Sequence, residues 1–355
     1  MRRDLASMLV FCVWVCSAQR SPALASDVWY VQAKPAVVAQ EISFANGDTR
    51  LVGTAYLPEN GDHLPAVIAL HGASEPTRSA ALYRHLCEGL PAMGIAVLIY
   101  DRRGSGESSG NRNNADYEAL ADDAIAGKNA LAKFPRIDPK RIGFWGLSQG
   151  GWLAVLAAAR DKDTAFAISV SAPLVTPEKQ MEFATTNLLT VRGHSREDAE
   201  RMLKARRAWI GYLNGTTSRA QALEEIRKAE AQPWFDLAFL PRASNLTTDP
   251  EHSSARKEMA YDPIATLRKL KVPLLFIYGG EDPWVPVAQS IKQLDSLSKQ
   301  QENIRYAVIA DASHEMMLLA RETMAFDAKT MNENAPHAPG YFMLIGSWLD
   351  RQVRH

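Results

Sequence analysis

Short apolar runs of strand length recur along most of the chain, and from residue 65 onward most are followed by a helical pattern. Two strand-like runs before that point are joined by Asn46-Gly47-Asp48, which is typical of a hairpin turn. The later runs are apolar almost throughout, as parallel strands are when helices cover both faces of a sheet. The eight predicted strands are 37–44, 51–57, 66–70, 95–100, 142–145, 165–170, 273–278 and 304–309.

Helices are predicted where apolar positions recur every three or four residues. Within 116–133 the residues of one face are Tyr117, Leu120, Ala121, Ala124 and Leu131. The other predicted helices of this alternating part are 80–93, 152–159, 287–299 and 340–353. The alternation predicts an α/β fold in which a mostly parallel sheet of eight strands is flanked by helices.

The alternation stops between residues 174 and 263, where only helical patterns occur. Ser195, followed by Asp198, is a plausible helix start. A helical insertion placed after the sixth strand favours a cap (lid) over the carboxyl edge of the sheet; the alternative is a set of packing helices with no role at a site. The predicted division is a core of 26–173 and 264–355 and a cap of 174–263. The cap is rich in aromatic residues, namely Trp209, Tyr212, Trp234, Phe235 and Phe239.

The first 25 residues have the pattern of a secretory signal peptide. Arg2 and Arg3 precede an apolar run, and Ala23-Leu24-Ala25 supplies the small residues of a cleavage site. The run is too short to span a bilayer comfortably, so a signal peptide is favoured over a membrane anchor. We expect cleavage after Ala25, export to the periplasm or the medium, and no stable membrane anchor afterwards. The mature chain would keep one cysteine, Cys87, as a small buried residue without a disulfide.

Composition and residue spacing argue against several classes of function. The 355 residues include 40 basic and 40 acidic residues, and this balance argues against a nucleic-acid-binding protein. No cysteine–histidine cluster has the spacing of metal ligands, so neither a metal nor a cofactor is expected. The run from Asp101 to Gly110 does not fit G-x-G-x-x-G and is interpreted as a glycine-rich turn, not a phosphate loop. The oligomeric state stays open.

The motif that carries chemistry is Gly146-Leu147-Ser148-Gln149-Gly150, between a predicted strand and an alanine-rich helix. A nucleophile on such a sharp turn needs small neighbours two positions away, which the two glycines provide. The turn also directs the amide of Gln149 toward the place where negative charge develops, so Gln149 is one predicted oxyanion donor. The second is the amide of Ala73, in the loop His71-Gly72-Ala73-Ser74 after the third strand.

A nucleophilic serine needs a base, and the base needs an orienting carboxylate. Such groups collect at the carboxyl ends of parallel strands. Asp282 and His314 follow the last two predicted strands, which completes the chain order Ser148, Asp282, His314. Glu281 and Asp311 are the less natural alternatives for the acid.

The other histidines considered are interpreted as structural. His63 precedes a strand, His85 falls in a surface helix pattern, and His194 and His252 belong to the insertion. His71 is expected to pack under its loop.

These residues resemble those of the α/β-hydrolase family over most of residues 40–355. The resemblance depends on His71-Gly72, on the run from Asp101 to Gly106, on Gly146-x-Ser148-x-Gly150, on Asp282 ahead of Val285-Pro286, and on His314. Within the family the chain is similar to the bacterial esterase, dienelactone-hydrolase and prolyl-oligopeptidase-like branches. Dienelactone hydrolases that resemble it have a cysteine where this chain has Ser148, and their insertion is shorter. The resemblance implies the α/β-hydrolase fold with a helical cap.

The expected function is an exported serine hydrolase that cleaves small carboxylic esters through an acyl-enzyme on Ser148, as carboxylesterases do. The aromatic insertion favours an apolar acyl part. A serine peptidase or amidase with the same mechanism is the alternative, ranked lower because the sequence offers no propeller domain and no obvious acidic site for a free N-terminus. A binding protein that has lost catalysis is a third possibility, and the presence of all three triad residue types argues against it.

Overall fold

The structure is a computed structural model that describes residues 37–74, 76–112, 115–318 and 336–353. The predicted signal peptide lies outside these residues. Residues 35–355 form one compact unit. None of the helices in the described ranges combines the length and the apolar character that crossing a membrane requires.

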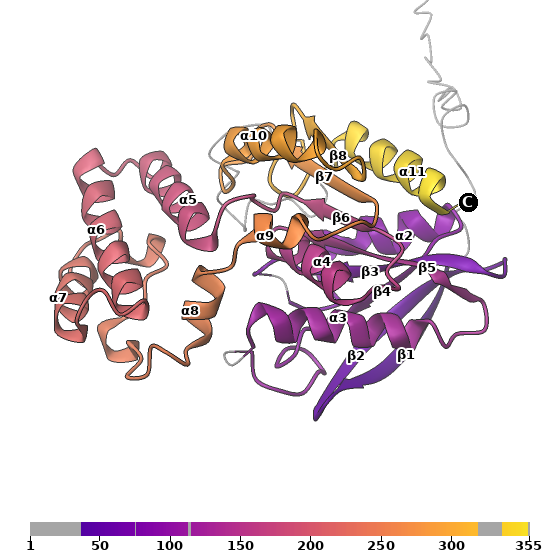
Figure 1. Cartoon of the computed structure of the whole chain (residues 1–355), viewed down its shortest axis with the longest axis horizontal. Helices are drawn as coiled ribbons and strands as arrows, with labels where there is room; N and C mark the ends of the chain where they lie inside the picture. The colour runs from indigo at the N-terminus through magenta and orange to yellow at the C-terminus, as the bar shows by residue number, and fades with distance from the viewer. Residues whose placement is uncertain (1–36, 75, 113–114, 319–335, 354–355) are drawn as a thin grey trace, which may run out of the picture. The chain divides into compact units, whose positions relative to one another are not determined.

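A single sheet of eight strands organises this unit (Figure 1). Strand β2 (Thr49–Pro58) is antiparallel to β1 (Val37–Asn46) and to β4 (Ala96–Tyr100), and all other neighbouring strands are parallel. The predicted mostly parallel sheet is therefore confirmed. In spatial order its strands are β1 (Val37–Asn46), β2 (Thr49–Pro58), β4 (Ala96–Tyr100), β3 (Leu64–Leu70), β5 (Ile137–Leu147), β6 (Ala167–Val170), β7 (Leu274–Gly279) and β8 (Ile304–Ile309).

Local sequence accounts for most of these strands. The hairpin between β1 and β2 turns at Gly47, whose φ of +55° is the left-handed conformation that glycine tolerates best. Strand β5 begins at Ile137, earlier than predicted, because Ile137 pairs with Leu64 of β3 before a break in register. The residues between Ile137 and Ile142 are polar or partly exposed, so the apolar pattern did not include them.

Helices cover both faces of the sheet, as the alternating pattern predicts. One face packs against α3 (Tyr117–Leu131), α4 (Gln149–Arg160), α9 (Pro263–Leu267) and α10 (Val287–Ser298). The other face packs against α2 (Arg84–Ala92) and α11 (Pro339–Val353). The predicted apolar face of α3 is buried at every position, and Cys87 of α2 is buried as well. The short α9 was not predicted.

His85 is half-buried, so it is more enclosed than its surface helix pattern predicts. Its ring packs against those of Trp145, His337 and Tyr341, and one ring nitrogen lies 3.2 Å from the Tyr341 hydroxyl. Burial, with His337 beside it, lowers the pKa of His85 to about 3, so the ring stays neutral near pH 7. Two of these partners, His337 and Tyr341, come from the far end of the chain, which helix periodicity cannot reveal.

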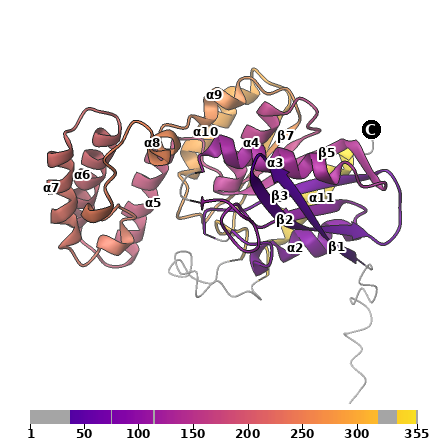
Figure 2. The same cartoon turned by 90° about the horizontal axis from the view of Figure 1, so that it is seen from below.

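Between β6 and β7 the described residues form helices and no strand, in line with the helical pattern of this stretch. Helix α6 (Arg196–Leu213) packs against both α5 (Pro177–Val191) and α7 (Arg219–Glu230) (Figure 2). The three helices share a small apolar core. Ser195 and Asp198 form the reciprocal capping box that starts α6. The longer helices of this segment are α5 (Pro177–Val191), α6 (Arg196–Leu213), α7 (Arg219–Glu230) and α8 (Ser254–Met259).

Candidate active site

Ser148 occupies a strained turn between β5 and α4. Its φ of 56° and ψ of −120° are a conformation that non-glycine residues rarely adopt. A Cβ atom at Gly146 would overlap the carbonyl of Gly150, and one at Gly150 would overlap the carbonyl of Leu70. The glycines of the motif therefore let the turn close, and the backbone N–H of Ser148 is held by the carbonyl of Val170 at 2.7 Å. The Ser148 side chain is half-buried, at the carboxyl end of β5.

Asp282 and His314 meet at the carboxyl ends of β7 and β8. The Nδ1 atom of His314 lies 2.8 Å from Oδ2 of Asp282, whose side chain has no exposed surface. The other carboxylate oxygen accepts the backbone N–H groups of Trp284 at 2.8 Å and Val285 at 3.1 Å. The carboxylate is thus fixed from both sides and orients the imidazole.

The two alternatives for the orienting acid differ from Asp282 in burial and in their contact with His314. Glu281 and Asp311 are exposed, whereas Asp282 is buried and is the carboxylate that bonds the ring of His314.

The charge of Asp282 also sets the proton affinity of His314. Burial of the ring lowers the pKa of His314, but the charge and hydrogen bond of Asp282, together with the neighbouring carboxyl of Glu315, raise it to about 9. Glu315 was not singled out from the sequence. Its pKa is itself raised by burial. The site therefore contains an imidazole that holds a proton more tightly than a free histidine does.

Ser148 is not bonded to this pair. Although both residues are described, no hydrogen bond joins the hydroxyl of Ser148 to His314. Strand β6 and strand β7 separate β5 from β8 in the sheet, so the loop that carries His314 has to reach back across these strands. Catalytic hydrogen bonds of unliganded enzymes are often long and tighten when substrate binds.

The loop after β3 lies beside the turn that carries Ser148. A Cβ atom added to Gly72 would come within 3.8 Å of the Cβ atom of Ser148. The N–H of Gly72 donates to the hydroxyl of Tyr83 at 2.9 Å, whereas Ala73 is exposed and its carbonyl accepts from Arg112 at 2.5 Å. Gln149 is the first residue of α4, where backbone N–H groups lack intrahelical partners. The two predicted oxyanion donors therefore belong to adjoining segments.

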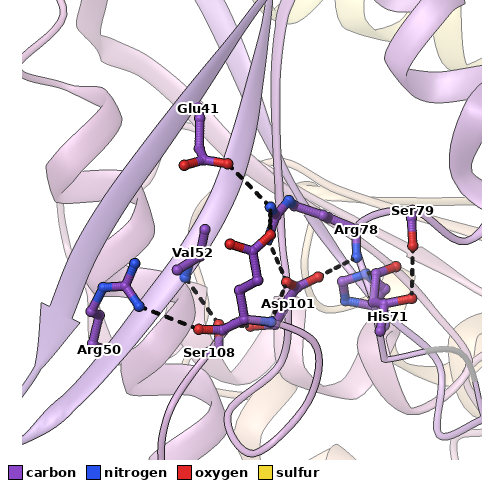
Figure 3. A network of polar contacts seen from close by, with 10 residues as sticks. Glu41, Arg50, Val52, His71, Arg78, Ser79, Asp101 and Ser108 are labelled. Carbon is purple, nitrogen blue, oxygen red and sulfur yellow. Dashed lines mark hydrogen bonds and ion pairs between the residues drawn. The ribbon is translucent and has the colours of Figure 1, made fainter.

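A network of charges around Asp101 joins the loops that follow β3 and β4 (Figure 3). The Asp101 carboxylate accepts the backbone N–H of Arg78 at 2.8 Å and forms an ion pair with its guanidinium group, which also pairs with Glu41 at 3.2 Å. A Cβ atom at Gly106, where φ is +53°, would overlap that carboxylate. The glycine-rich segment is thus a structural turn, as predicted. His71 is buried under its loop, with Nε2 3.2 Å from the carbonyl of Thr77.

In the part of the chain that the structure describes, no three side chains of the types His, Cys, Asp and Glu converge as metal ligands do. What the arrangement offers is a strained serine hydroxyl, an oriented imidazole and backbone amides at a helix start.

Comparison with known proteins agrees with this fold. Residues 67–328 match the model of the alpha/beta hydrolase family, and the chain belongs to that family. Thiohydrolase aneE of Aspergillus aculeatus is 27% identical over 297 residues, which are 79% of this chain and 87% of that protein. Esterase EstD of Thermotoga maritima is 24% identical over 272 residues, which are 75% of this chain and 58% of that protein. A solved esterase of Pyrococcus furiosus shares the fold with a TM-score of 0.56 and 20% identity, over 89% of this chain and 91% of that one.

Proposed function

We propose that this protein is a serine hydrolase that cleaves carboxylic esters through an acyl-enzyme. Ser148 Oγ attacks the carbonyl carbon while His314 Nε2 accepts its proton, and Asp282 stabilises the resulting imidazolium. The amides of Gln149 and Ala73 bind the oxyanion of the tetrahedral intermediate. His314 then returns the proton to the leaving alcohol, and water, activated by the same histidine, hydrolyses the acyl-enzyme.

The observation that carries this proposal is that a strained serine and an oriented imidazole both follow strands of one sheet at their carboxyl ends. Ser148 has the positive φ of a nucleophile turn, and the Asp282–His314 hydrogen bond is 2.8 Å. Strained backbone conformations of this kind persist where the surrounding structure enforces them, most often at functional sites. The family membership favours the same chemistry.

The helices of residues 174–263 serve in this proposal as a cap that contributes to the substrate site. Asn187 and Gln180 of α5 donate to the carbonyls of Pro283 and Trp284, both at 3.0 Å, directly after Asp282. Phe239 is 54% exposed, has a φ of 50°, and its ring centroid lies 6.2 Å from that of Trp284. An exposed aromatic side chain held there suits an apolar acyl group.

The proposal also includes a localisation. We assign residues 1–25 to a cleaved signal peptide and the mature protein to the periplasm or the medium, from the pattern of Arg2, Arg3 and Ala23-Leu24-Ala25.

A peptidase or amidase with the same catalytic residues is the second candidate for the reaction. The name of the thiohydrolase relative also makes a thioester a substrate to compare.

The test combines a fluorophosphonate probe with substrates of the three classes. We expect the probe to label Ser148 stoichiometrically, as read by mass spectrometry of the tryptic peptide. Wild-type enzyme should hydrolyse short p-nitrophenyl esters with higher kcat/KM than acyl thioesters or aminoacyl and dipeptidyl arylamides. Absence of labelling on folded protein would support a binding protein without catalysis, and faster arylamide cleavage would support the peptidase.

Phe239→Ala is expected to change the preference for acyl length. Loss of the apolar surface that Phe239 offers to a bound acyl chain should raise KM for a p-nitrophenyl octanoate about ten-fold, while KM for the acetate changes little. Met343→Ala is the matched control, since Met343 is a 73% exposed apolar residue of α11. Equal effects of Phe239→Ala on both esters would show that the cap does not contact the acyl chain.

A further inference from the structure

Arg102 is a buried cation between the two segments that hold the proposed oxyanion donors. It follows Asp101 at the carboxyl end of β4 and is 6% exposed. Its Nη1 donates to Oε1 of Gln149 at 2.7 Å, and its Nη2 donates to the backbone carbonyl of His71 at 2.9 Å. One guanidinium group therefore bridges the turn after β5 and the loop after β3.

Arg102 differs in its partners from the arginines around it. Arg103 pairs with the buried carboxylate of Asp123, and Arg78 pairs with Asp101. Among the described residues, no carboxylate forms an ion pair with Arg102. Burial accordingly lowers the pKa of its guanidinium group. Burying a charge costs free energy that its partners must offset, and the hydrogen-bond acceptors of Arg102 lie on the two segments that hold the proposed donors. Burial raises the pKa of the Glu258 carboxyl, and the charge of Arg102, which forms no ion pair with it, opposes this rise.

We propose that Arg102 is the positioning residue of the oxyanion site, an inference that depends on the proposed hydrolase function. The peptide unit between His71 and Gly72 is held at both ends, its carbonyl by Arg102 and its N–H by the Tyr83 hydroxyl at 2.9 Å. The next amide, that of Ala73, is the proposed donor.

Gln149, whose backbone amide is the other proposed donor, is also held by hydrogen bonds to Arg102 and to a tyrosine hydroxyl. The side chain of Gln149 accepts from Arg102 at 2.7 Å and donates to the Tyr117 hydroxyl at 3.4 Å. Both segments are thus fixed relative to one rigid, planar group, whose donors match two acceptors at once. The positive charge of Arg102 acts in the same direction, since it favours the negative charge of the intermediate in a poorly solvated site.

Arg102→Met tests this role, because it removes the charge and both hydrogen bonds while keeping an unbranched side chain. We expect kcat for a p-nitrophenyl ester to fall about 10- to 100-fold, as misplaced donors do, with KM changed less than about three-fold. Endpoint labelling by the fluorophosphonate should stay complete, because Ser148 is intact, whereas the labelling rate should fall with kcat. Arg102→Lys, which keeps the charge and one donor, should recover part of the loss.

Arg136→Met is the matched control. Arg136 also donates to two backbone carbonyls, those of Gly61 and Pro58, both at 2.8 Å, but it precedes β5 and lies away from the carboxyl edge. Wild-type kcat is expected for this variant. If Arg102→Met does not fold, Gln149→Met carries the test, since it removes the Arg102 acceptor and keeps the backbone amide. Gln149→Met should then lower kcat without raising KM.

The outcomes separate this inference from the function on which it depends. Unchanged kcat and labelling rate in Arg102→Met, with Ser148→Ala inactive, would overturn the role of Arg102 alone. Wild-type turnover in Ser148→Ala would overturn the hydrolase mechanism, and the role of Arg102 with it. A fall in endpoint labelling that matches the fall in kcat would show that Arg102 merely supports folding.

Discussion

Ser148→Ala is expected to lower turnover of a p-nitrophenyl ester by about 10⁶-fold, because the variant has no nucleophile to form the acyl-enzyme. The fold should survive, since alanine removes one half-buried hydroxyl that makes no hydrogen bond to His314. Steady-state kinetics with an active-site titration of the wild type gives the ratio, and thermal unfolding checks the fold.

Ser347→Ala is a suitable control for this variant. Ser347 is exposed on α11, and its hydroxyl donates to the carbonyl of Leu344 at 3.2 Å within the same helix. Its turnover should match the wild type. Substantial ester hydrolysis by Ser148→Ala, at more than about one part in 10³ of the wild-type rate, would contradict the acyl-enzyme mechanism.

Asp282→Asn should lower kcat by about 10⁴-fold with little change in KM, because the amide no longer holds the imidazole in the tautomer that accepts a proton. The exposed neighbour provides the control: Glu281→Gln changes the same kind of group one residue away and should keep wild-type kcat. Comparable losses in the two variants would mean that Asp282 is not the orienting acid.

The same pair predicts how activity depends on pH. Free His314 must be neutral to act as a base, and its pKa is raised to about 9, so kcat/KM should increase with pH well above the usual histidine range. In Asp282→Asn the burial that lowers the His314 pKa remains while the carboxylate that raises it is gone. The apparent pKa of the residual activity should therefore fall below that of the wild type. A pH profile that is the same in both proteins would exclude this origin of the His314 proton affinity.

The raised pKa also affects stability, with a definite sign. A histidine that binds its proton more tightly in the folded state stabilises the fold fully below about pH 6.5, and this contribution is lost as the pH rises through about 9. The pH that favours catalysis by His314 is therefore the pH at which the Asp282–His314 pair contributes least to folding.

Local chemistry explains what could be predicted without coordinates. The turn at Ser148 depends on Gly146, whose Cβ atom would collide with the carbonyl of Gly150 inside the same motif, so at this position the motif and the structure correspond directly. Gly150 is needed for a longer-range reason, because its Cβ atom would meet the carbonyl of Leu70. The hairpin at Gly47 and the capping box at Ser195 are likewise decided by neighbours in the chain. Burial of the apolar runs accounts for the strands, and for the helices that cover them.

Contacts between distant segments decided the rest. Glu281 and Asp282 are adjacent acids, of which the sequence favours Asp282; the difference between them in the structure is that Asp282 is buried and bonds His314, whereas Glu281 is exposed. Arg102 and Arg103 are adjacent as well, yet one bonds Gln149 and the other Asp123. The sequence alone determined which elements form and which residue types could perform the chemistry, because these depend on periodicity and on short-range sterics. Only the tertiary structure decided that Arg102, and not Arg103, bonds Gln149, and how strongly His314 binds its proton, because both depend on burial and charge contributed by strands far apart in the chain.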